Sequence, residues 1–113
     1  MSEIVDSLLE RCSTLPLVAL SQAKTPPAIQ KVTSAARLIF ELGSFLQEHD
    51  TVAVGGDGDI YIRFDKKAYF VIDNDRENAA LLVLEREYLE FSLSEAAVAI
   101  GRVKEFLGRC LCV

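Results

Sequence analysis

The short turns between residues 51 and 91 constrain the fold of this chain more than any other feature of its sequence. Apolar runs alternate there with polar or glycine-containing turns, and no interval is long enough for the crossover helix that parallel strands require. Tight turns of this kind favour antiparallel pairing of neighbouring strands. The expected strands are 51–54, 59–64, 68–72 and 79–85, and residues 88–91 form either a fifth strand or the end of the fourth after a bend.

Apolar residues at helical spacing precede this strand region. A first helix is expected to start at a Ser2 cap, and residues 15–20, interrupted by Pro16, form either an extended connection or one helical turn. The Thr-Pro-Pro sequence at 25–27 is typical of a helix start, with threonine as the cap and proline at the first helical positions. We expect this second helix to run to about Glu48.

A last helix is expected after the strands. Ser92 and Glu95 have the spacing of a capping box, in which serine caps the helix and glutamate follows three residues later. A chain of 113 residues has the usual size of one domain. The sequence therefore predicts one α+β domain over residues 1–113, with two N-terminal helices, an antiparallel four- to five-stranded β-meander and a C-terminal helix.

Both faces of the expected sheet carry apolar or aromatic side chains. A sheet face in contact with water ordinarily carries polar side chains instead. One face can be supplied by Ile60, Ile62, Phe64, Phe70 and Ile72. The other would carry Tyr61, Tyr69, Val71 and one set from Leu81 to Leu84. Either helices cover both faces, or one face meets another chain, most simply a second copy. Aromatic side chains with polar tips are enriched at protein interfaces, so the predicted partner-binding residues are Tyr61, Tyr69, Val71 and Tyr88.

Charge and hydropathy exclude two classes of partner. The net charge is −5, and the basic pair Lys66-Lys67 has Asp65 beside it, so the clustered Lys and Arg of a nucleic-acid binder are missing. No segment supplies the roughly 20 apolar residues that a membrane span needs. Glu3 and Asp6 do not fit the basic start of a signal peptide, and we expect a cytoplasmic protein.

The sequence assembles no catalytic constellation. His49 is the sole histidine, so neither a Ser-His-Asp set nor a histidine-rich metal site can be formed. An EF-hand count that starts at Asp73 puts Asn78 where the loop needs glycine, so the acidic residues after 72 are interpreted as turn residues. We therefore predict no catalytic residue, no metal and no cofactor.

The cysteines stand at positions 12, 110 and 112, and their odd number argues against a disulfide framework. Cys12 lies on an apolar stripe and is expected to be a small buried residue. Cys110 and Cys112 could form half of a metal site that a dimer completes, or a prenylation box. The favoured interpretation is a tail in which Cys110 completes the core stripe.

A glycine-rich segment follows the first expected strand. The sequence Gly55-Gly56-Asp57-Gly58 resembles the Gly-Gly-Asp-Gly element of the NAD kinase and diacylglycerol kinase superfamily. This resemblance implies contact with nucleotide phosphates through the loop Gly55, Gly56, Asp57, Gly58 and Asp59. The chain departs from the family at Asp59, where the family has threonine, and in the strand-like sequence that follows. The favoured interpretation is a glycine-rich hairpin connection.

The order of elements from Thr25 to Glu85 is similar to that of small uncharacterised helix-plus-β-meander proteins of bacterial and phage mobile elements. The resemblance implies an accessory or antitoxin-type binding module. Together with the apolar sheet, it predicts a non-enzymatic protein-binding module (an inhibitor, antitoxin or immunity-like protein) that self-associates. The alternative is a small-ligand or nucleotide-binding domain that uses the loop 55–59.

Overall fold

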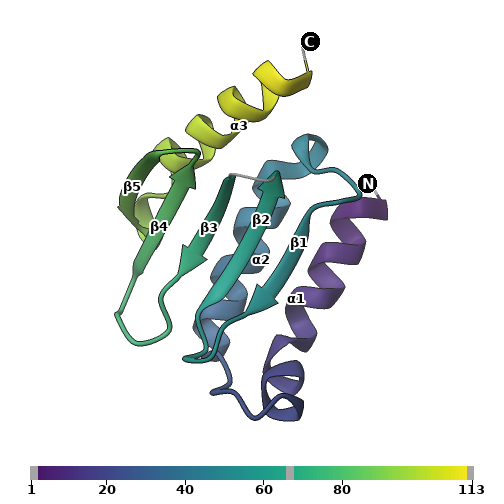
Figure 1. Ribbon diagram of the computed structural model, residues 1–113, viewed down its shortest axis with the longest axis vertical. Helices are drawn as coiled ribbons and strands as arrows, with labels where there is room; N and C mark the ends of the chain where they lie inside the picture. The colour runs from purple at the N-terminus through teal and green to yellow at the C-terminus, as the bar shows by residue number, and fades with distance from the viewer. Residues whose placement is uncertain (1–2, 66–67, 112–113) are drawn as a thin grey trace.

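The computed structural model describes residues 3–65 and 68–111, which form three α-helices, two 3-10 turns and five strands. The elements in chain order are α1 (Glu3–Ser21), α2 (Ile29–Leu42), η1 (Gly43–Phe45), β1 (Thr51–Val54), β2 (Ile60–Asp65), β3 (Ala68–Ile72), β4 (Ala79–Leu84), β5 (Glu87–Ser92), η2 (Leu93–Glu95) and α3 (Ala97–Leu111). Figure 1 shows this order as a colour gradient along the chain. None of the described helices is long and apolar enough to cross a bilayer.

The five strands form one antiparallel sheet in the order β1-β2-β3-β4-β5, so each strand pairs with its neighbour along the chain. This arrangement confirms the predicted α+β meander. It also decides between four and five strands, because Glu85 and Arg86 form a two-residue turn between β4 and β5. Glu85 has a φ of 55°, a positive value of the kind that such tight hairpin turns require.

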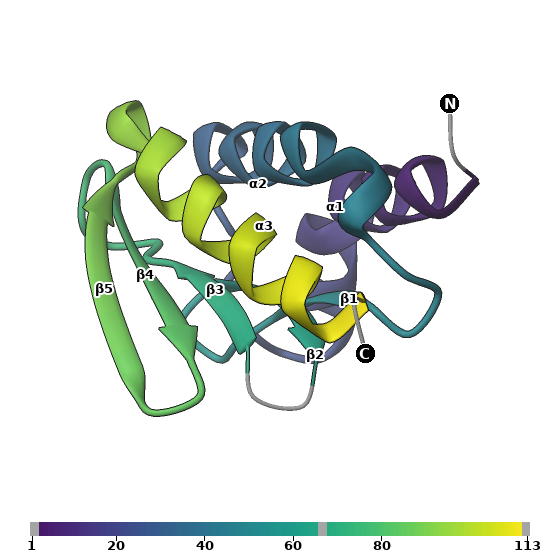
Figure 2. The same cartoon turned by 90° about the horizontal axis from the view of Figure 1, so that it is seen from above.

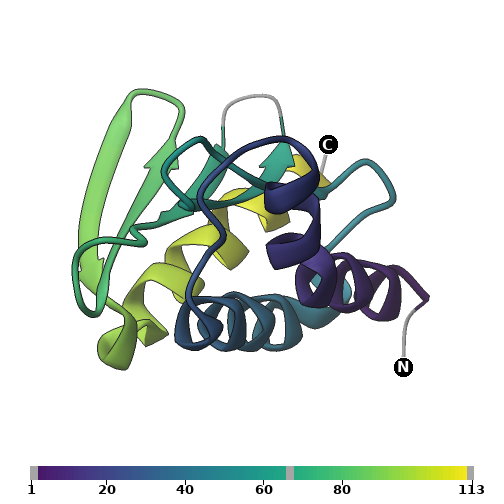
Figure 3. The same cartoon turned by 90° about the horizontal axis from the view of Figure 1, so that it is seen from below.

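The described helices lie on one side of the sheet (Figures 2 and 3). Helix α1 packs against α2 and along β1, α2 lies behind β2, and α3 contacts α2 and β4. The core lies between this helical layer and the sheet. Its largest fully buried side chains are Phe64, Phe70, Ile39, Leu42, Ile60, Ile62, Ile72, Leu82, Val103 and Cys12.

Helix α1 settles the ambiguity around Pro16, because the helix continues through the proline to Ser21. The residues that face the core share a helical spacing that extends across the proline: Val5, Leu8, Cys12, Leu15 and Ala19. Burial of this stripe offsets the hydrogen bond that the proline cannot donate. The predicted cap, Ser2, lies outside the described residues.

The predicted limits of the second helix are wrong at both ends. Helix α2 begins at Ile29 after an extended Ala28. Thr25 and Pro26 each precede a proline, and such residues avoid the helical region, so the helix does not start at the prolines. The helix ends at Leu42 because Gly43 adopts a φ of 48°, and the Gly43 N–H still bonds to the Ile39 carbonyl. Ile29, the first residue of the helix, is exposed.

The predicted capping box is also wrong. Ser92 precedes η2 and its side chain makes no cap hydrogen bond, while α3 begins only at Ala97. The Ser92 hydroxyl is used elsewhere, since Asn78 Nδ2 donates to Ser92 Oγ at 2.6 Å and to Ser94 Oγ at 3.1 Å. The serines therefore join the starts of β4 and η2, a contact between distant residues that local spacing does not reveal.

Candidate functional site

The sheet face turned away from the helices is the candidate site, and we call it the open face (Figure 1). Successive side chains of a strand point to opposite faces, and the alternate residues belong to the buried core. The strand register places the open-face residues in two adjacent rows. One row is Thr51, Arg63, Tyr69, Val83 and Tyr88, and the other is Ala53, Tyr61, Val71, Leu81 and Glu90.

The open face is aromatic and aliphatic at its centre. The rings of Tyr61 and Tyr69 lie 6.3 Å apart at 41°, and the guanidinium of Arg63 lies 6.0 Å from the centre of the Tyr61 ring. Val83 is 4% exposed and yet does not belong to the core cluster under the helices. Its register neighbour Tyr88 is 71% exposed, which is high for an aromatic side chain.

The structure brings the predicted partner-binding residues together, since Tyr61, Tyr69, Val71 and Tyr88 all lie on the open face. Of the two arrangements considered for the sheet, the described helices cover one face only. The faces of β4 could not be assigned from the sequence, because the run 79–84 is apolar throughout and has no alternation. The register assigns Leu81 and Val83 to the open face.

The glycine-rich segment connects β1 to β2 as a hairpin, as favoured from the sequence. The Gly55 N–H donates to the Asp59 carbonyl at 2.8 Å, and the Gly58 N–H donates to the Gly55 carbonyl at 3.1 Å. The Gly56 carbonyl accepts the Thr25 N–H at 3.1 Å. These bonds give the loop a structural role in which it holds the chain that leads into α2. Phosphate binding by residues 55–59 stays a prediction.

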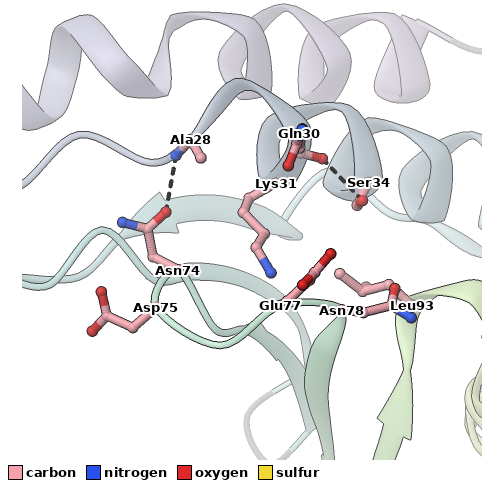
Figure 4. A pocket seen from close by; sticks show the side chains of 9 residues that line it. All are labelled: Ala28, Gln30, Lys31, Ser34, Asn74, Asp75, Glu77, Asn78 and Leu93. Carbon is pink, nitrogen blue, oxygen red and sulfur yellow. Dashed lines mark hydrogen bonds between the residues drawn. The ribbon is translucent and has the colours of Figure 1, made fainter.

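Asn74 joins three separate segments of the chain, and Figure 4 shows its bond to Ala28. Its Oδ1 accepts the Ala28 N–H at 2.9 Å, its Nδ2 donates to the Asp57 carbonyl at 3.1 Å, and its N–H donates to Asp59 Oδ1 at 2.9 Å. Asp73 Oδ1 accepts the N–H groups of Asp75 and Arg76, which confirms the predicted turn. The Asp59 and Asp73 carboxylates therefore both bond to backbone N–H groups of the β3–β4 loop.

Lys31 is a buried cation that the sequence did not single out. Its side chain is 7% exposed, and Nζ donates to the Arg76 carbonyl at 2.7 Å. Figure 4 shows it reaching from α2 toward the β3–β4 loop across a polar pocket. The pocket is lined by Ala28, Gln30, Lys31, Ser34, Asn74, Asp75, Glu77, Asn78 and Leu93. Two carboxylates at its rim and the bonded ammonium make it a poor match for an anion.

The reactive side chains of the described residues lie apart. His49 follows η1 with Nε2 3.5 Å from Asp50 Oδ1, and Asp50 Oδ2 accepts the Gln47 N–H. Cys12 is buried as predicted, and desolvation raises the pKa of its thiol from 9.0 to about 11. No group of three His, Cys, Asp or Glu side chains within the described ranges could hold a metal. Cys112 and the side chain of Cys110 lie outside the part of the chain that the structure describes.

No protein-family model, curated protein or solved structure matches the chain. The open face is therefore the feature from which a function can be inferred.

Proposed function

We propose that this chain is a non-enzymatic protein-binding module and that the open face is its binding surface. The observation that supports the proposal is a continuous set of aromatic and aliphatic side chains that none of the described helices covers. An antiparallel sheet with one face in water ordinarily carries polar residues on that face. Inhibitors, antitoxins and immunity-like proteins act by such binding, and the sequence predicts this group.

The side chains of the open face suit an interface. Tyrosine supplies a large contact area with few rotatable bonds, and its hydroxyl can still form a hydrogen bond when the ring is buried in an interface. Tyr61 and Tyr69 already lie against one another, so little side-chain freedom remains to be lost on binding. Tyr88 is open to solvent on β5 and is available to a partner.

The test compares a binding-face variant with a matched variant on the other side of the molecule. The tagged full-length chain is used to capture bound protein from cells of the native host. Capture of an untagged copy of the same chain is also scored as binding. Tyr88→Asp should reduce the captured amount at least about tenfold, because loss of an aromatic hot spot from an interface costs about 2 kcal/mol or more. Phe40→Asp is the control, since Phe40 is a comparably accessible aromatic on α2. Equal capture by the Tyr88→Asp variant, with its folding verified by circular dichroism, would contradict the proposal.

A further inference from the structure

We propose that the open face binds the open face of a second copy, in a two-fold dimer that places Arg63 of each copy opposite Glu90 of the other. This inference rests on the proposed function and names its partner.

The charges of the open face are complementary to each other. Among the strand residues whose side chains the structure describes, this face carries one cation, Arg63, and one anion, Glu90. The carboxylate of Glu90 has no hydrogen-bond or ion-pair partner within the described residues, and Arg63 rests beside the Tyr61 ring. The charges of these described strand residues thus cancel, whereas the whole chain has a net charge of −5. A face that binds a basic partner should be negative, and a face that binds an acidic partner should be positive. A face with one charge of each sign instead suits a second copy of itself.

The positions of the two charges fit a symmetric dimer. Arg63 lies on β2 and Glu90 on β5, three strand spacings of about 4.8 Å apart, and they occupy the two different rows. In such a dimer the two-fold axis runs between the two facing sheets and parallel to them. Each residue of one sheet then lies opposite the residue of the other copy that occupies its mirror position across the axis. The axis that places Arg63 opposite Glu90 is the perpendicular bisector of the segment that joins these two residues on the face. It therefore passes between β3 and β4.

Apolar side chains occupy that line. Tyr69 and Val71 lie on β3, and Leu81 and Val83 lie opposite them on β4. In the dimer these four residues meet the same set of four residues of the other copy at the centre, and one Arg63–Glu90 pair lies toward each side. An apolar centre with charged groups at the rim is the usual anatomy of a protein interface. Two sheets that pack face to face lie about 10 Å apart, a distance that arginine and glutamate side chains bridge together.

Charge reversal tests this geometry in the full-length chain. By sedimentation equilibrium the native chain should be a dimer. Arg63→Glu creates two acidic pairs and Glu90→Arg creates two basic pairs, so each variant alone should dissociate at least about tenfold more readily. An equimolar mixture of the two variants should restore the dimer, because every pair across the interface then has opposite charges. Glu41→Arg, at an exposed position of α2 on the other side of the molecule, is the control and should remain dimeric.

Three outcomes would overturn the inference. They are a monomeric native chain at the highest soluble concentration, single variants that dimerise as well as the native chain, and a mixture that does not restore the dimer. Circular dichroism confirms that each variant is folded. If the native chain is monomeric while Tyr88→Asp still abolishes capture of a different protein, the open face is a binding surface and only the choice of partner is wrong. If Tyr88→Asp changes nothing either, the proposed function fails as well.

Discussion

Gly58 is the residue whose identity the β1–β2 connection requires. Its φ is +87°, in a region that L side chains rarely adopt. A Cβ at this position would approach Asn74 Nδ2 and would lie 3.0 Å from the Thr25 carbonyl oxygen. The glycine thus lets the hairpin come close to both the β3–β4 loop and the chain before α2.

Replacement of Gly58 by alanine is therefore expected to destabilise the fold by about 1–3 kcal/mol, through backbone strain and loss of the Asn74 contacts. Gly56→Ala is the matched control in the same loop, since a Cβ there would meet no atom within 4 Å. Urea denaturation measures the free energy of unfolding of both variants. A Gly58→Ala variant as stable as the Gly56→Ala variant would show that the loop is not held in the conformation described.

At the scale of elements, one buried ammonium connects α2 to the β3–β4 loop. Lys31 is 7% exposed, and its bond to the Arg76 carbonyl is a charge-assisted hydrogen bond at 2.7 Å. The same loop is joined to the start of α2 through the Ala28–Asn74 bond. These two contacts hold the first turn of α2 against the β3–β4 loop.

Lys31→Met keeps most of the buried side-chain volume but removes the hydrogen-bond donor. It should therefore lower the free energy of unfolding by about 1.5–3 kcal/mol. Amide hydrogen exchange should also become faster in residues 73–78, where the loop loses its anchor. Gln30→Met, at the exposed neighbouring position, is the control and should leave both measurements nearly unchanged. Faster exchange spread evenly over the whole sheet would argue against a local anchoring role.

The elements that were predictable are those set by local patterns. The alternation in β2 and β3 and the short turns around them define the meander, because apolar side chains at a period of two are typical of a strand. The limits of α2 were not predictable from its prolines, because Thr-Pro-Pro fits both a helix start and an extended approach. Lys31 was missed because a helical lysine is ordinarily solvated, and its burial depends on a carbonyl 45 residues away.

The candidate site was predictable in part for the same reason. Tyr61, Tyr69 and Val71 follow from alternation within their strands, whereas the face to which Val83 belongs depends on strand register. The role proposed for Glu90 does not follow from the sequence, because its distance from Arg63 is set by three pairings between strands. Which face the helices cover is likewise a property of the assembled fold.

At the scale of the whole molecule, the Cys12 thiol links stability to pH. It lies where α1 meets α2, with Sγ 3.5 Å from the Val32 carbonyl oxygen. Its desolvation disfavours the thiolate and raises its pKa to about 11. The unfolded chain gives up this proton at lower pH than the folded chain, so between the two pKa values the folded state binds more protons.

The free energy of unfolding should therefore decrease as the pH rises from about 9 to about 11, while the contribution of this thiol stays constant at lower pH. Cys12→Ala provides the reference, because the two chains differ only at this thiol. Denaturant unfolding at several pH values should show a steeper decline for the native chain than for the variant. Parallel curves would mean that the thiol ionises as easily in the folded state as in the unfolded one.

The nearest-neighbour order of the strands has a consequence for the assembly of the sheet. Each hairpin can form from residues close together in the chain, so the sheet can grow strand by strand without waiting for a distant partner. Helix α3 is the last element to be made, and it must then pack against α2, which was made long before it. A chain emerging from the ribosome would therefore carry its whole sheet before its core is sealed.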